Sequence, residues 1–177
     1  SEKERVADDI RKLEEENKEV LDRAAEEIKR LKKRDRELNK RHHKTIRDLV
    51  DELEKKVRDE ETLRRVKERM REIDERVKES SKRVEDELEK LLEELKRHSE
   101  EVVRRLRELL ERLKRVDDSR VLDEIVKEAR DLSEENRKLI EEALERLRRL
   151  SRENEETIKK TMEELKRLVE EVKERAR

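Results

Sequence analysis

Apolar residues recur at steps of three and four along almost the whole chain, and this period constrains the fold more than any other feature of the sequence. Such steps place side chains on one face of an α-helix, whereas a half-buried β-strand requires strict alternation. The period is maintained in three long stretches and is interrupted only near residues 58–62 and 116–119. We therefore predict three helices, at about residues 2–58, 62–116 and 119–176.

Each stretch carries a single apolar stripe, which a helix has to bury against a neighbouring element. In the third stretch the stripe is Leu122, Ile125, Ala129, Leu132, Leu139, Ala143, Leu147, Leu150, Ile158, Leu165, Leu168 and Val172. Because short loops make consecutive helices antiparallel neighbours, we expect an all-α, coiled-coil-like, up-down-up three-helix bundle. It is predicted as one elongated domain over residues 1–177, with antiparallel helices of about 55 residues and about 80 Å each.

Both interruptions carry the charge signals of helix ends. Lys55, Lys56 and Arg58 precede the segment Asp59–Thr62, and the same change from basic to acidic residues recurs before Asp117-Asp118-Ser119. Basic side chains suit the negative end of a helix and acidic ones the positive end. Asp, Ser and Thr are also preferred at the N-cap, so each interruption predicts one helix end followed by one helix start.

The composition supports helices and excludes several classes of function. Charged residues make up 60% of the chain, yet 53 basic and 54 acidic residues give a net charge of only −1, and Gly, Pro, Cys and aromatic residues are absent. Balanced charge without helix breakers is typical of long helices rather than of disorder. Nucleic-acid binding is not expected without a basic excess or aromatic side chains.

No apolar run is long enough for a transmembrane helix, and no secretory signal stands at the N-terminus. We expect a soluble monomer that requires no partner, nucleic acid or membrane. The cellular location stays undetermined, and recombinant cytoplasmic expression is the expected source.

Polar residues continue the apolar stepping at a few positions, and an up-down-up bundle brings them to similar heights. One predicted layer contains Asn17, His98 and Asn136. The second surrounds His42 and contains Asn39, Thr45, Ser80, Ser81, Asn154, Thr157 and Thr161, with Asp35 and Ser151 just beside it. Clustering lets buried polar groups bond to one another and avoid a cost of about 1–3 kcal/mol each. The alternative is that individual Ser, Thr and Asn side chains lie half exposed at the stripe edge, and we expect His43 at the surface.

The residues favour no chemical activity. The chain has three histidines, of which His42 and His43 are adjacent and His98 lies far away, so a three-histidine zinc site is not expected. Asp35, His42 and Ser80 or Ser81 resemble a Ser-His-Asp triad only superficially, because no glycine elbow or oxyanion loop accompanies them. Loops without glycine do not cradle phosphate as a P-loop does. We therefore predict no catalytic, cofactor-binding or metal site, and no enzyme.

Near-equal helices, acidic starts, basic ends and polar layers together resemble de novo designed helical bundles with buried hydrogen-bond networks. The resemblance covers the whole chain and implies a structural scaffold whose polar layers specify helix register and pairing. An interaction or pH-responsive assembly module, which binds a partner helix or self-associates, is the alternative. A spectrin-like repeat is shorter and usually has a buried Trp, and an isolated charged helix has no sustained apolar stripe.

Overall fold

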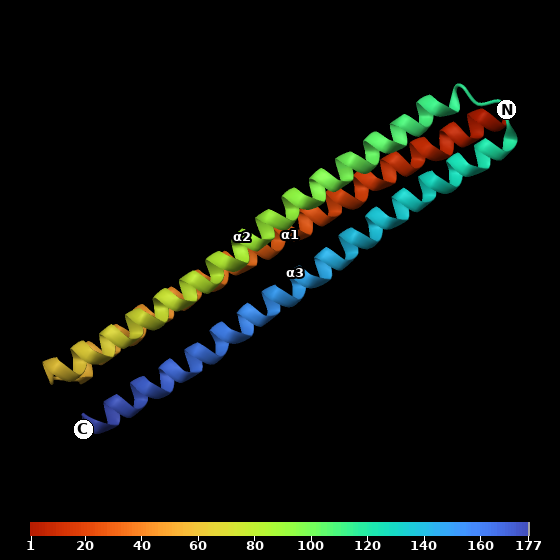
Figure 1. Cartoon of the computed structure of the whole chain (residues 1–177). Helices are drawn as coiled ribbons and strands as arrows, with labels where there is room; N and C mark the ends of the chain where they lie inside the picture. Colours follow the sequence, from red (N-terminus) through yellow and green to blue (C-terminus); the bar gives the residue numbers. More distant parts are fainter. Residues whose placement is uncertain (177) are drawn as a thin grey trace. The chain divides into compact units, whose positions relative to one another are not determined.

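The computed structural model describes residues 1–176, and within them the chain forms three long α-helices (Figure 1). Helix α1 spans Glu2–Lys56, α2 spans Glu60–Leu113 and α3 spans Ser119–Arg175. The described residues contain no strand and no residue with positive φ. The prediction of an all-α bundle of three long helices is confirmed.

The first connection lies slightly earlier than the sequence predicted. Helix α1 ends at Lys56, and Asp59 serves as the N-cap of α2, so that helix begins at Glu60. Thr62 Oγ1 donates a hydrogen bond to Asp59 Oδ2 at 2.6 Å. The Thr62 hydroxyl and backbone N–H groups of the first turn lower the pKa of Asp59 below its usual value. The acidic segment therefore includes the first turn of α2, not only the loop.

The second connection also begins earlier than predicted. Helix α2 ends at Leu113, where Arg115 N donates to Arg112 O at 3.1 Å in a tighter turn. Asp118 then caps α3, because its Oδ1 accepts a hydrogen bond from Arg120 N at 3.0 Å. Both helix starts thus use a carboxylate to bind N–H groups that have no partner within the helix.

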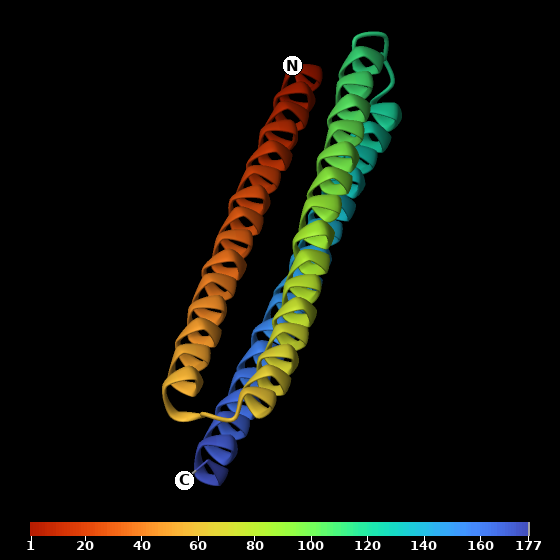
Figure 2. The same cartoon turned by 90° about the vertical axis from the view of Figure 1, so that its left-hand side faces the viewer.

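Packing divides the chain into two compact units, each built from a segment of all three helices. The course of each helix can be followed by its colour in Figures 1 and 2. The first unit contains Ser1–Lys29 and Leu88–Leu147, and the second contains Arg30–Glu87 and Arg148–Arg177. The predicted single domain over the whole chain stays a prediction.

Ion pairs give the helix directions in the first unit. Arg107 contacts Glu14 at 2.8 Å, and Asp117 contacts Lys3 at 3.5 Å, so α1 and α2 run antiparallel. Helix α3 runs antiparallel to α2, because Arg112 contacts Glu128 whereas Ser99, earlier in α2, bonds to Asn136, later in α3. Helix α3 is therefore parallel to α1. This is an up-down-up arrangement.

The second unit has the same directions. Arg36 pairs with Glu85, and Lys67 pairs with Glu54, which sets α1 and α2 antiparallel. Exposed pairs of this kind contribute little stability individually, so the burial of apolar side chains has to supply most of it.

Each unit has its own apolar core with side chains from all three helices. The first core consists of Val6, Ile10, Val102, Leu106, Leu109, Leu113, Leu122, Ile125, Ala129 and Leu132. The second consists of Ile46, Leu53, Val57, Val66, Met70, Leu165, Val169 and Val172. Such burial stabilises a fold by about 25 cal/mol per Å² of apolar surface.

The predicted stripe of α3 is wrong at one position. Leu139 is 40% exposed, whereas its neighbour Ile140 is 1% exposed. Ile140 lies seven residues before Leu147 and seven after the buried Ser133, and therefore on the same heptad face. Stepping by three or four from Asn136 allowed either residue, and the heptad spacing selects Ile140.

Candidate functional site

The polar layer of the first unit is centred on Asn136, whose side chain from α3 bonds to both other helices. Asn136 is 0% exposed. Its Nδ2 donates to Asn17 Oδ1 on α1 at 2.7 Å. Its Oδ1 accepts from His98 Nδ1 at 2.9 Å and from Ser99 Oγ at 3.4 Å, both on α2. One buried amide thus joins three helices.

Asn17 completes this network. Its Nδ2 donates to the backbone oxygen of Leu13 at 2.6 Å and to Ser133 Oγ at 2.9 Å. A backbone carbonyl only accepts, so this contact fixes which end of the Asn17 amide carries nitrogen. Asn17 Oδ1 is then left to accept from Asn136, and the donors and acceptors of both amides match.

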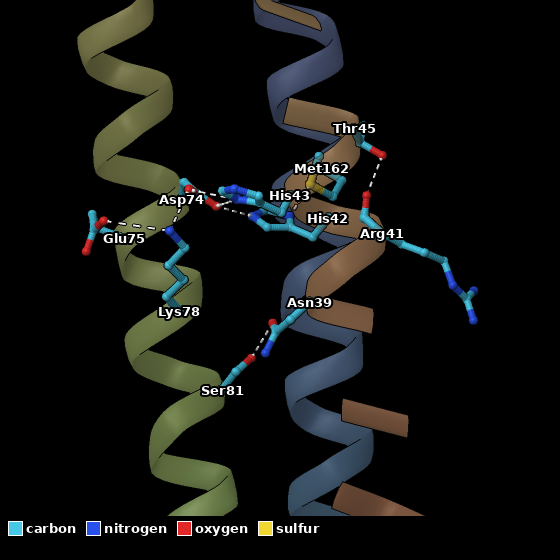
Figure 3. Close-up of polar contacts among 10 residues, drawn as sticks. All are labelled: Asn39, Arg41, His42, His43, Thr45, Asp74, Glu75, Lys78, Ser81 and Met162. Atoms are coloured by element: carbon cyan, nitrogen blue, oxygen red, sulfur yellow. Dashed lines mark hydrogen bonds and ion pairs between the residues drawn. The ribbon is translucent and has the colours of Figure 1, made fainter. Parts of the chain in front are cut away.

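The polar layer of the second unit has the same plan, with Asn154 of α3 at its centre. Asn154 Nδ2 donates to Asp35 Oδ1 on α1 at 2.8 Å and to Ser81 Oγ on α2 at 3.3 Å. Its Oδ1 accepts from Ser80 Oγ at 3.0 Å. Ser81 Oγ donates in turn to Asn39 Oδ1 at 2.8 Å (Figure 3). Again one asparagine bridges all three helices.

Asp35 makes this second layer different from the first. It is 6% exposed, and burial raises the pKa of its carboxyl above the usual 3.8. The hydrogen bond from Asn154 acts in the opposite direction, and the nearby charge of Glu85 adds to the rise in the pKa of Asp35. The layer therefore contains a carboxyl group whose charged form is disfavoured.

His42 lies apart from the Asn154 network, between α2 and α3. Its Nδ1 contacts Met162 Sδ on α3, and its Nε2 lies 3.5 Å from Asp74 Oδ1 on α2 (Figure 3). The second contact is close enough for an ion pair, but Nε2 is buried and makes no hydrogen bond. Burial lowers the pKa of His42 below the usual 6.5, the charge of Asp74 opposes this shift, and His43 and Lys78 add to it.

Asp74 gathers charged and titratable groups around one buried carboxylate. The residue is 8% exposed. Its oxygens lie 3.3 Å from Lys78 Nζ and 3.3 Å from His43 Nδ1 (Figure 3). The His43 side chain is 44% exposed, so it reaches this carboxylate from the surface.

Several predicted members of the second layer do not join it. The hydroxyls of Thr45, Thr157 and Thr161 each donate to a carbonyl four residues earlier in their own helix. Ser151 is half-buried, and no bond to another helix is found for it in residues 1–176. Asp35 bonds to Asn154 rather than to His42, so Asp35, His42 and a serine are not arranged as a triad.

Sequence reasoning missed four buried polar residues: Asp74, Ser99, Ser133 and Lys173. The signal was present for Asp74, because 70–74–77 continues the stripe as well as 70–73–77 does. The same holds for Ser99, which follows Leu95 by four residues and precedes Val102 by three. A step of three or four allows two adjacent candidates, and packing decides between them.

In the described part of the chain, no group of three His, Cys, Asp or Glu side chains is placed to hold a metal ion. No helix among those residues is long and apolar enough to cross a membrane. Comparison of the chain with protein-family models, curated proteins and solved structures finds no match.

Proposed function

We propose that the chain is a designed structural scaffold without catalytic activity, whose buried polar layers specify which helices pair and in what register. The observation that carries this proposal is the bridging role of one α3 asparagine in each unit: Asn136 bonds to α1 and α2 in the first, and Asn154 does so in the second. A polar layer of this kind stabilises only an arrangement in which its partners meet.

The short connections do not by themselves determine how the three helices pack. The loops at residues 57–59 and 114–118 make consecutive helices neighbours, but α3 is free to pack on either side of the α1–α2 pair. Apolar cores accept many arrangements of similar volume. A misplaced layer would leave buried amides unpaired, at about 1–3 kcal/mol for each group. The layers therefore select one arrangement by penalising the others.

Other features support a designed origin. Acidic residues stand in the first turn of α1 and of α2, and basic residues stand in the last turn of all three helices. The helices contain no Gly or Pro, the two residues that most weaken a helix interior, although the absence of Gly at the helix ends departs from the usual pattern of designed bundles. The terminal charges complement the helix dipole at the starts of α1 and α2 and at the ends of all three helices, which is the consistency that design rules seek.

The test replaces both bridging amides with apolar side chains, in the variant N136L/N154L. We expect helix content by circular dichroism to be retained, because leucine favours helices. We expect the variant to give several sets of amide NMR signals or a larger mass by light scattering. The control E15L/T157L adds one leucine at an exposed position in each unit. A single set of signals and a monomeric mass for N136L/N154L would contradict the proposed role.

A pH-responsive assembly module is the second candidate, and the buried His42 beside Asp74 favours it. Protonation of His42 would place a second charge in this interior and alter packing between helices. Light scattering at pH 7.5 and pH 5 tests this candidate directly. A change in mass on acidification would support it, and a constant mass would rule out assembly driven by acid.

A further inference from the structure

A groove of about 570 Å³ lies between α1 and α2 in the second unit, and its rim is strongly basic. Lys40, Lys44 and Arg47 line it from α1, and Lys78 and Lys82 line it from α2. The bond between Asn39 and Ser81 places Lys40 and Lys82 at about the same height on opposite sides. Cations therefore face cations across this groove.

Elsewhere on the same helix pair, opposite charges meet. Lys67 on α2, for example, pairs with Glu54 on α1. Within the groove both carboxylates are already engaged, Asp74 by Lys78 and Glu85 by Arg36. Among residues 1–176, Lys40, Lys44, Arg47 and Lys82 make no such pair, which leaves their charges uncompensated. Cations outnumber carboxylates among the residues that line the groove, so the groove has a local excess of positive charge, although the net charge of the chain is −1. These like charges repel one another.

The side chain of Asn39 adds a hydrogen-bond donor to the groove. Its Oδ1 accepts from Ser81, and in the described part of the chain its Nδ2 has no acceptor. His42 also lines the groove, but its Nε2 is buried and lies 3.5 Å from Asp74 Oδ1, so this nitrogen is not offered to a ligand. The groove thus offers one amide donor whose acceptor is missing.

We propose that this groove binds a polyanion of the phosphate class, held by Lys40, Lys44, Arg47 and Lys82 and by the free amide of Asn39. Phosphate oxygens accept charge-assisted hydrogen bonds from ammonium and guanidinium groups. A volume of about 570 Å³ lies within the range typical of small-ligand sites. Asp74, compensated by Lys78, marks the end of the groove that the anion avoids.

Titration with inorganic tripolyphosphate at low ionic strength tests this site in the full chain. Affinity is measured by isothermal titration calorimetry, and position by the side-chain amide signals of the four asparagines, which are free of overlap with glutamine because the chain has none. We expect saturable binding, with the largest shift at Asn39. The variant K44E/K82E should weaken binding by about tenfold or more.

The control K90E/K138E makes the same change in net charge on exposed lysines of the first unit. It should bind as the unmodified chain does. Equal weakening in both variants would show a general attraction between charges and overturn the proposal, as would binding that leaves the Asn39 amide unshifted, or no binding at all. If circular dichroism shows that K44E/K82E has lost helix, K40E/R47E is read by the same criteria.

Discussion

Both units contain a buried polar layer that connects all three helices, but the two layers are built from different chemical groups. In each, one α3 asparagine bonds to the other two helices, Asn136 in the first unit and Asn154 in the second. The first network consists of amides, serine hydroxyls and one imidazole. The second includes the buried carboxyl of Asp35, with the His42–Asp74 contact nearby in the same unit. An asparagine that bridges three helices is therefore compatible with a buried carboxyl group. Among the described residues, the buried Asp35 and His42, whose pKa values are shifted, both lie in the second unit.

These shifts have opposite consequences for stability. The pKa of His42 is lowered in the folded state, so the unfolded chain binds more protons as pH falls below about 6.5, and stability is lost there. The pKa of Asp35 is raised, so the folded chain keeps its proton longer, and stability is lost as pH rises above about 3.8. The second unit thus contains two groups that prefer to be neutral.

The largest expected effects come from the apolar cores and should not distinguish the units. Leu106 in the first unit and Leu165 in the second are 0% and 1% exposed. Leu106→Ala and Leu165→Ala should each reduce the free energy of unfolding by about 2–5 kcal/mol, through lost burial and a residual cavity. Chemical denaturation at pH 7.5 and pH 5 should give the same reduction at both values. A strongly pH-dependent cost for either leucine would mean that the cores themselves differ.

Removing the bridging amides should separate the units. Asn136→Ala leaves the side chains of Asn17 and His98 without their partner, at a cost of about 2–3 kcal/mol at pH 7.5. Asn154→Ala should cost a similar amount at that pH, because it removes the donor to the Asp35 carboxylate.

Acidification distinguishes the two alanine variants. Without Asn154 the folded-state pKa of Asp35 rises further, so protonation relieves part of the cost as pH falls. Denaturation at a series of pH values from 7.5 down towards 3.8 should therefore show that the cost of Asn154→Ala falls with pH more than the cost of Asn136→Ala does. Parallel behaviour of the two variants would remove the proposed distinction.

A smaller and opposite effect is expected for Asp35→Asn. The new amide oxygen still accepts from Asn154 Nδ2, while the buried charge disappears. Replacing a poorly solvated charge with a neutral group should stabilise the chain by about 1 kcal/mol at pH 7.5. The gain should shrink as pH falls towards the usual carboxyl pKa of 3.8, because the raised pKa of Asp35 makes the native carboxyl take up its proton before the unfolded chain does. Destabilisation at pH 7.5 would indicate that the Asp35 carboxylate has a favourable partner.

The smallest effect concerns the acid side of the stability profile. His42→Leu removes the group that disfavours folding as pH falls from 6.5 towards 5, so the variant should lose less stability over that interval than the unmodified chain. His43→Leu is the matched control at the adjacent, half-exposed position. Chemical denaturation midpoints across this interval give the comparison, and an unchanged slope for His42→Leu would exclude His42 as the acid-sensitive group.

The sequence predicted the helices well because the apolar period runs through all of them. It placed the ends of α1 and α2 and the start of α2 two or three residues late, since both Asp59 and Thr62 are N-cap types and the prediction began the second helix at residue 62 rather than after Asp59. It missed Ile140, Ser99 and Asp74, because a step of three or four admits two neighbouring residues. It also placed Thr157 in the layer, although the hydroxyl bonds to a carbonyl of its own helix. Height along a helix was predictable, whereas the direction of each side chain depends on packing.

Hydrogen exchange of the asparagine side-chain amides tests the central claim most directly. The chain has four asparagines and no glutamine, so a ¹⁵N–¹H spectrum contains four pairs of such signals. The bonded and buried amides of Asn17, Asn136 and Asn154 should exchange much more slowly than that of the half-buried Asn39, whose Nδ2 donates no bond within residues 1–176. Equally fast exchange at all four, at the rate of an unfolded chain, would show that the layers are open to water and contradict the account.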